Sequence, residues 1–426
     1  MTTPNASPPP NLSFPKRYYV ALQYRDFMWI WLGSLGGQSA YWALIVARGV
    51  LVLEMTGSSA LVGITTFAAM IPRVIMPPFV GYMADRFDRR AILATSYVLQ
   101  FVHAAVLTTL AFADVLAVWH IVALATINGT VRTFQQTTTQ ALIPNVVPRE
   151  HWLNAISLNQ VTIQGSRLFG PGLVAPALLL SGPSAAFAAA AFFYLLGIIS
   201  VLSIKTRSSG GLKKGDSIGA SLKEAAVYAW GHPQIRTLFI VVALHCSMTM
   251  AFESTLPVFA RDVLDAGRGG VTYLMMGVGG GALVTVIIVA GVRGSLARGR
   301  ILFVAGFCSG ASMLGLALST SPAFAIVAAA GMGAAQAAFM AVSGAMVQSL
   351  APDEMRGRIS GLNQINVGGT MAMVNLANGF AADIWSAPYV LTALGLGFMV
   401  VMAATLLVST ARGFYRGDIP LPARAR

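Results

Sequence analysis

The chain has 426 residues, of which 56% are hydrophobic and only 10% are charged, and its formal net charge is +13. Soluble domains usually carry about 25% charged residues, so this composition is typical of a membrane protein and excludes an ordinary soluble domain. The two cysteines, Cys246 and Cys308, both fall inside apolar stretches, which indicates buried core residues and predicts neither a disulfide nor a metal site.

The first 20 residues are polar and rich in proline, and they lack the short apolar segment of a signal peptide. We therefore expect residues 1–25 to form a cytosolic tail. Twelve apolar stretches follow, each long enough to cross a hydrocarbon core about 30 Å thick, which needs about 20 helical residues. In chain order these predicted spans lie at approximately 27–53, 58–80, 91–112, 115–141, 153–180, 184–204, 235–260, 271–292, 301–319, 322–350, 359–381 and 387–410.

Basic residues fall almost entirely on one side of this map. Of the 28 lysines and arginines, 22 lie in alternate loops and in the tails, two (Arg261 and Arg268) lie on the other side, and four lie within spans. Positive residues mark the cytoplasmic side, so we expect both termini in the cytosol and a multi-pass protein of the bacterial inner (plasma) membrane. The excess charge then faces anionic membrane lipids, and no nucleic-acid partner is needed to explain it.

The sequence contains an internal repeat. Residues 81–90 match 291–300, and residues 147–160 match 351–364, at offsets of about half the chain. The repeat predicts an all-α fold with two six-helix bundles at 26–205 and 235–411, and with a cytosolic tail at 412–426. The polar segment 206–234 separates them, and its second part is typical of an amphipathic surface helix. Because two bundles already complete a transport path, we expect a monomer.

The segment after the second span carries a family resemblance. Residues 56–90 resemble the second helix and the following loop of the major facilitator superfamily, and residues 143–160 and 347–364 resemble paired loops of its drug and siderophore exporter branch, which includes enterobactin- and macrolide-type exporters. The resemblance runs from about residue 25 to residue 412. It implies alternating access between two bundles, and it implies that a cytosolic latch stabilises the outward-open state; the latch residues are Gly81, Asp85, Arg86, Arg89 and Arg90. Alternatively, the loop arginines only determine topology.

Polar residues recur at helical spacing within several spans. In this superfamily the first, fourth, seventh and tenth helices line a central cavity, so the resemblance implies that stripes on the first and fourth spans face it, with the fifth-span stripe near its edge. Charged residues inside a membrane cost roughly 2.5–3.5 kcal/mol each on insertion scales and are functional candidates. The candidate cavity residues are Gln38, Tyr41, Arg48, Asn128, Arg132, Gln135, Gln164, Arg167, His245, Asn363 and Asn366.

Other roles are open for several of these residues. Arg48 lies toward the outer end of its span, where its side chain could reach the membrane surface. Arg132 and Arg167 could form structural ion pairs or networks, and His245 could be an ordinary core histidine. Glu253 could pair structurally with an arginine of the first half.

Glu253 is the acid that lies well inside a predicted span, and it is the candidate for proton coupling together with Arg132. Burial disfavours a charged carboxylate and a nearby arginine favours it, so a change of state can move a proton on and off. Four intramembrane arginines, with Arg73 as the fourth, oppose this one glutamate. The cavity should therefore be positive and suit an anionic or acceptor-rich small molecule.

Motifs for catalysis or nucleotide binding cannot be found in the sequence, so we expect no enzyme activity and no cofactor or metal. The glycine run at residues 277–281 lies within the eighth predicted span and indicates close helix packing. We expect a proton-coupled exporter of a small amphipathic or anionic compound. The alternatives are a gradient-driven uptake transporter, a lipid flippase, or a membrane receptor or sensor that does not transport.

Overall fold

The computed structural model describes residues 19–206, 208, 218–289, 292, 294–352 and 355–418, and this part of the chain is folded into helices without strands. The first half contains η2 (Val20–Gln23), α1 (Arg25–Thr56), α2 (Ser59–Met70), α3 (Pro72–Ile75), α4 (Pro77–Arg86), α5 (Arg89–Phe112), α6 (Val118–Val146), η3 (Arg149–His151) and α7 (Trp152–Leu202). The second half contains α8 (Ile218–Gly231), α9 (Pro233–His245), the π-helix η4 (Cys246–Met250), α10 (Leu256–Asp262), α11 (Gly267–Val289), α12 (Ser295–Ala317), α13 (Pro322–Leu350), α14 (Arg356–Trp385), α15 (Ala387–Thr405) and α16 (Ser409–Arg416).

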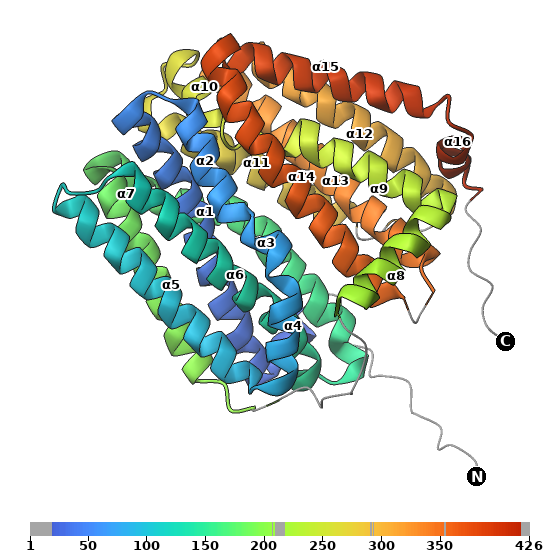
Figure 1. Ribbon diagram of the computed structural model, residues 1–426, viewed down its shortest axis with the longest axis horizontal. Coiled ribbons are helices and arrows are strands. Elements are labelled where there is room, and N and C mark those ends of the chain that lie inside the picture. The colour runs from blue at the N-terminus through green and yellow to red at the C-terminus, as the bar shows by residue number, and fades with distance from the viewer. Residues whose placement is uncertain are drawn as a thin grey trace.

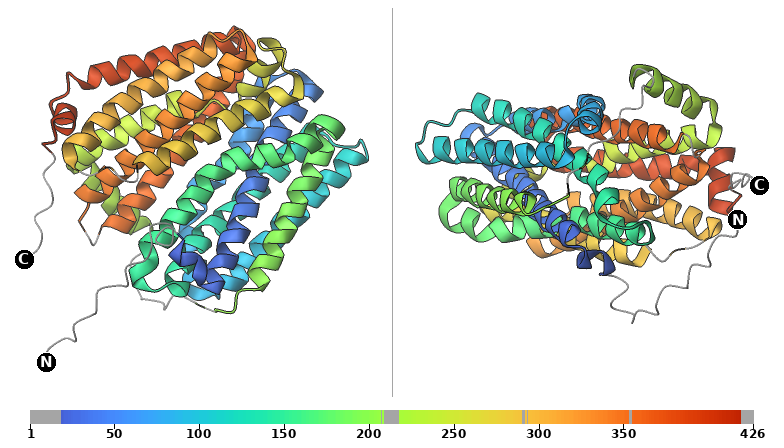
Figure 2. Two further views of the ribbon diagram at one scale, coloured as in Figure 1. Left: turned by 180° about the vertical axis from the view of Figure 1, so that it is seen from behind. Right: turned by 90° about the horizontal axis from the view of Figure 1, so that it is seen from below.

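The two halves form two bundles that lie side by side, as Figure 1 shows by colour, with α1–α7 on one side and α9–α15 on the other. The same division is visible from behind in Figure 2. This arrangement confirms the predicted all-α fold of twelve spans in two bundles. Among the described residues, seven helices are long and apolar enough to cross a membrane.

The remaining predicted spans are not single long apolar helices, because breaks divide them or polar side chains lower their hydropathy. The second span is divided into α2, α3 and α4 by Pro72 and Pro77, which cannot donate the backbone hydrogen bonds of a continuous helix. The fifth and sixth spans run together as α7 and are separated at Gly182, whose φ of 80° favours glycine. The seventh span consists of α9, η4 and α10.

The two ends of the bundles differ. At the end where α4 meets α5 and where α12 and α14 begin, the loops and helix starts carry Arg86, Arg89, Arg298 and Arg356; we call it the basic end. The opposite end is where α1 meets α2 and where α14 meets α15.

The halves pack closely at the opposite end. A Cβ atom added to Gly379 of α14 would lie 2.6 Å from the backbone oxygen of Ser59 in α2, so the two helices meet there without room for a side chain. Glu54 at the end of α1 accepts two hydrogen bonds from Arg268 at the start of α11, at 2.6 and 3.1 Å. These contacts close the space between the halves at this end.

Candidate transport cavity

A cavity of about 670 Å³ lies between the two halves. Its lining reaches the basic end through Val292, Arg298 and Ser360, whereas the connections at the opposite end contribute none of the lining residues. The structure is therefore open toward the basic end. The polar and aromatic lining residues are Tyr41, Trp42, Arg73, Arg132, Gln136, Gln140, Gln160, Gln164, Arg167, Glu253, Arg298, Gln336, Gln348, Ser360, Asn363 and Gln364.

Aromatic rings hold two of the cavity arginines. The guanidinium carbon of Arg132 in α6 lies 3.2 Å from the centroid of the Tyr41 ring, and that of Arg167 in α7 lies 4.6 Å from the Trp42 ring. Tyr41 and Trp42 are consecutive residues of α1, and their rings meet edge to face at 5.6 Å. A ring face attracts a guanidinium without neutralising its charge. In the described part of the chain, the Nε atoms of both arginines are buried and have no hydrogen-bond partner.

Glu253 lies in the short non-helical segment between η4 and α10, which brings its carboxylate into the cavity. Its side chain is only 6% exposed, and its Oε2 atom has no hydrogen-bond partner in the described structure. Arg167, Arg73 and Arg132 are the charged groups that act on it electrostatically, but within the described residues it forms no ion pair. The carboxylate is thus surrounded by positive charge without being bound to it.

Amide side chains complete the polar wall. Eight of the lining residues are glutamine or asparagine, spread over α6, α7, α13 and α14. Each amide can donate and accept hydrogen bonds, so the wall can satisfy varied polar groups without adding charge. With four arginines and one glutamate among the lining residues, the cavity carries a net positive charge.

Six of the residues predicted for the cavity or for coupling line it. They come from both halves and are Tyr41, Arg132, Gln164, Arg167, Glu253 and Asn363. The other predicted residues lie outside this lining. Gln135 accepts a 2.5 Å hydrogen bond from Gln100 inside the first half, Gln38 is buried in α1, and Asn366 donates to the backbone oxygen of Phe239 at 3.0 Å.

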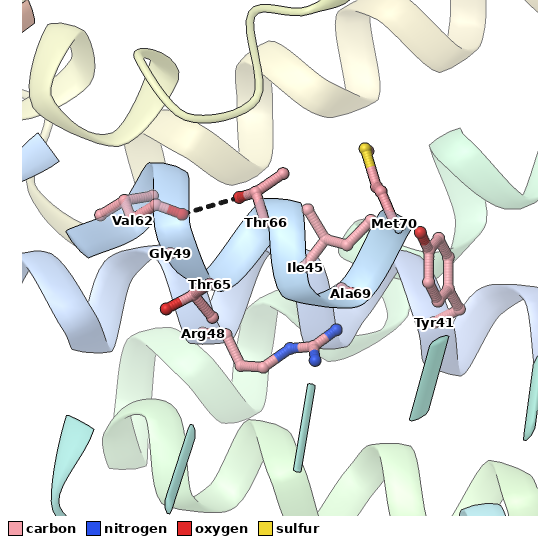
Figure 3. A pocket seen from close by; sticks show the side chains of 9 residues that line it. All are labelled: Tyr41, Ile45, Arg48, Gly49, Val62, Thr65, Thr66, Ala69 and Met70. Atoms are coloured by element: carbon pink, nitrogen blue, oxygen red, sulfur yellow. Dashed lines mark hydrogen bonds between the residues drawn. The ribbon is translucent and has the colours of Figure 1, made fainter. Parts of the chain in front are cut away.

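Arg48 and Asn128 form a separate buried group. Arg48 is 2% exposed, so it does not reach the membrane surface as the alternative interpretation expected. It donates from Nε to the backbone oxygen of Leu44 at 3.1 Å and from Nη2 to Oδ1 of Asn128 at 3.5 Å. Figure 3 shows it beside a pocket between α1 and α2, which at about 10 Å³ is large enough for one water molecule. Tyr41 and Met70 line both this pocket and the large cavity.

His245 has the surroundings of a core histidine, as its alternative interpretation proposed. The side chain is fully buried, and Nε2 lies 3.2 Å from the hydroxyl of Ser309. Its ring stacks on Phe339 with the centroids 4.0 Å apart and contacts Phe398 edge to face at 5.2 Å. These contacts keep it inside the second bundle.

The predicted latch residues lie at the basic end. A Cβ atom on Gly81 would meet nothing within 4 Å, so no other helix lies against this glycine in this conformation. Arg86 donates to the hydroxyl of Tyr82 at 2.8 Å, Arg90 to the backbone oxygen of Leu202 at 2.8 Å, and Arg89 to Oδ1 of Asn145 at 2.9 Å, all within the first half. The side chain of Asp85 lies outside the described residues.

Several lining residues were missed by the sequence prediction. Arg73 was counted among the intramembrane arginines but was not a candidate cavity residue, and Trp42 lies one residue off the predicted stripe. Gln336 is the amide in the alanine- and glycine-rich middle of α13, and its isolation there was a signal that could have identified it. Its Nε2 atom donates to the backbone oxygen of Thr249 at 2.6 Å, next to the break that positions Glu253.

Known proteins resemble the chain in sequence. It matches the family described as transmembrane secretion effector over residues 18–414. It is 20% identical to the staphyloferrin A transporter of Staphylococcus aureus over 303 residues, covering 70% of this chain and 73% of that protein. It is 22% identical to the multidrug efflux pump Tap of Mycolicibacterium fortuitum over 327 residues, covering 75% of this chain and 80% of that protein. A shorter match of 149 residues, at 25% identity, relates it to macrolide efflux protein A of Streptococcus pyogenes, covering 35% of this chain and 37% of that protein.

Solved structures share the fold. A mutant of the nucleoside transporter NupG superposes with a TM-score of 0.72 at 13% identity, covering 90% of this chain and 99% of that one. A POT family transporter in complex with 5-aminolevulinic acid superposes with a TM-score of 0.70 at 11% sequence identity, covering 90% of this chain and 96% of that one. The family match extends over nearly the whole chain and agrees with the two-bundle fold and its cavity. The chain therefore belongs to the transmembrane secretion effector family and is a membrane transporter of the major facilitator type.

Proposed function

We propose that this transporter exports a small amphipathic compound with anionic groups from the bacterial cytosol, driven by protons that move inward. The observation that carries the proposal is the cavity charge, because four lining arginines face one carboxylate. Buried guanidinium groups without acid partners bind carboxylates or phosphates through charge-assisted hydrogen bonds. The named relatives that act in multidrug and macrolide efflux support the export direction.

The proposed orientation places the basic end in the cytosol, since positively charged loops mark that side of a membrane protein. The cavity then faces the cytosol and can receive a cytosolic compound. Alternating access carries the bound compound outward when the contacts at the opposite end open and the basic end closes. Closure of the basic end would bring the latch residues of the first half against the second half.

Ligand binding tests the charge argument directly. Purified protein in detergent would be screened for thermal stabilisation by organic anions, organic cations and lysolipids, because a ligand that binds the folded state stabilises it by mass action. We expect anions to stabilise the wild type and to lose most of this effect in Arg132→Ala. Arg236→Ala is the matched control, since Arg236 is exposed in α9 outside the cavity lining. Stabilisation by cations alone would refute the proposed substrate class.

Transport itself needs a directional assay. In proteoliposomes loaded with a stabilising compound that carries an anionic group, export from the side of the basic end should increase when the opposite compartment is made acidic. Transport in the reverse direction only, under the same gradient, would show an uptake carrier instead.

A further inference from the structure

The cavity offers unpaired buried groups of both charges. The Nε atoms of Arg132 and Arg167 are donors without partners, and Oε2 of Glu253 is an acceptor without a partner, all within the described structure. The three side chains line the same cavity from α6, from α7 and from the break before α10. A buried polar group without a partner is costly, so this arrangement suits a ligand that supplies partners of both kinds.

Export driven by inward proton flow requires competition between substrate and proton, because the carrier must bind one or the other each time it changes between its two open states. A purely anionic substrate does not compete. Protonation of Glu253 would raise the net charge of the cavity by one unit and strengthen the binding of an anion. Since coupling between two ligands is reciprocal, the anion would in turn favour the proton, and both would move in the same direction.

A substrate with a cationic group behaves differently, because that group needs the ionised carboxylate of Glu253. Protonation removes this partner, so proton and substrate exclude each other. We propose that the substrate is a zwitterion, with an anionic group held by Arg132 and Arg167 and an amine-class cation held by Glu253. This inference rests on the proposed proton-driven export.

Few side chains near Glu253 other than its own carboxyl group can change their protonation in the working pH range. Arg73 on α3, Arg132 on α6, Arg167 on α7 and Arg298 on α12 keep their charge at any working pH, since a guanidinium is not deprotonated in proteins. The titratable groups that act on Arg132 are Tyr41, which lies beneath it, and Tyr194, and Cys246 on η4 acts electrostatically on Arg167. The variants Tyr41→Phe, Tyr194→Phe and Cys246→Ser therefore serve as controls for these groups.

Matched probes can test the inference. One drug-sized biphenyl scaffold would carry a carboxylate, a primary amine, both groups or neither, and its affinity for the purified full-length protein would be measured from pH 5.5 to pH 8.5. Both probe groups stay charged in this range, because a carboxyl and an amine titrate near 4 and 10. At pH 8.5 the zwitterion should bind at least tenfold more tightly than either singly charged probe.

The pH dependence is the decisive readout. The affinity of the zwitterion should fall several-fold as the pH is lowered, and this dependence should disappear in Glu253→Gln but persist in Tyr41→Phe, Tyr194→Phe and Cys246→Ser. A carboxylate-only probe that binds as tightly as the zwitterion, and gains affinity at low pH, would overturn the inference. If the zwitterion binds in competition with protons but a proton gradient does not drive its export, the inference stands and the proposed export fails.

Discussion

At the scale of single residues, the cavity arginines are held by aromatic rings, where acids would be the more familiar partners. A carboxylate beside Arg132 would neutralise its charge, whereas the ring of Tyr41 supports the guanidinium and leaves its N–H groups available. The neighbouring Trp42 supports Arg167 in the same way. Two consecutive residues of one helix thus position two of the four arginines of the cavity.

Removal of the ring beneath Arg132 should weaken anion binding. Such contacts contribute roughly 0.5–2 kcal/mol, so Tyr41→Leu should lower the affinity for anionic ligands by about 2–30-fold. Tyr41→Phe keeps the ring and should bind nearly as the wild type does. Titration calorimetry on the two purified variants gives the comparison, and equal losses in both would assign the effect to the hydroxyl group.

Proton coupling should depend on Glu253. We expect Glu253→Gln to abolish acceleration of transport by a proton gradient, because the amide resembles the protonated acid and cannot release a proton. Glu224→Gln is the control, since Glu224 pairs with Arg358 and lies outside the cavity lining. Transport rates in proteoliposomes would be measured with and without a gradient, and an unaltered response in Glu253→Gln would contradict the coupling role.

The sequence identified the cavity residues only in part. The stripe on α1 included Tyr41, which lines the cavity, but it also included Arg48, which lies almost two helical turns further along the same face. Beyond Tyr41 this face contacts Asn128 of α6 and lines the small pocket beside α2. Helical spacing reports which side chains share a face, but neighbouring helices decide where the face leaves the cavity.

At the scale of helices, glycines set the closest crossings within the second bundle. A Cβ atom on Gly333 of α13 would lie 1.9 Å from the backbone oxygen of Val278 in α11, and one on Gly281 of α11 would lie 1.9 Å from the backbone oxygen of Ala330. The predicted interpretation of the 277–281 run as a packing surface is confirmed by these distances.

A methyl group at this crossing should destabilise the bundle. Gly333→Ala would force the two helices apart, and overpacking of this kind costs typically about 1–3 kcal/mol. Gly344→Ala is a matched control on the same helix, because a Cβ atom there would have nothing within 4 Å. Thermal unfolding in detergent should show a lower midpoint for the first variant alone. Similar midpoints for both would mean that the crossing adapts without cost.

The helix boundaries were easier to predict than the breaks inside them. Apolar stretches of about 20 residues are direct signals, and all twelve spans were found. The break before Glu253 had no comparable signal, because the first proline of α10, Pro257, comes after it. The position of η4 follows from tertiary packing, including the hydrogen bond from Gln336 to Thr249.

At the scale of the molecule, Asp383 joins the two halves at the closed end. Its carboxylate accepts hydrogen bonds from the hydroxyl of Ser58 and the backbone N–H of Ser59, both at 2.6 Å, and from the N–H of Ala60 at 3.1 Å. Asp383 lies in the last turn of α14, where the dipole of its own helix disfavours a negative charge, whereas the start of α2 attracts one. This contact must break before the opposite end can open.

Neutralisation of Asp383 should therefore open this end more often. A reporter cysteine at Asn363, in a Cys246→Ser/Cys308→Ser background, would be labelled from the opposite end with a membrane-impermeant thiol reagent. Asp383→Asn should raise the labelling rate several-fold. Asp262→Asn should leave it unchanged, since Asp262 forms an ion pair with the adjacent Arg261 in α10 and none across the halves within the described residues. Equal rates in both variants would show that Asp383 does not hold the closed state.

The size of the cavity also has a consequence for hydration. By the measure on which the small pocket of about 10 Å³ has room for one water, 670 Å³ corresponds to on the order of fifty waters. When the basic end closes, most of this water must leave through the opening at that end. The turnover of the carrier is thus linked to the water activity on that side of the membrane, and solutes too large to enter the cavity favour the closed arrangement by drawing its water out.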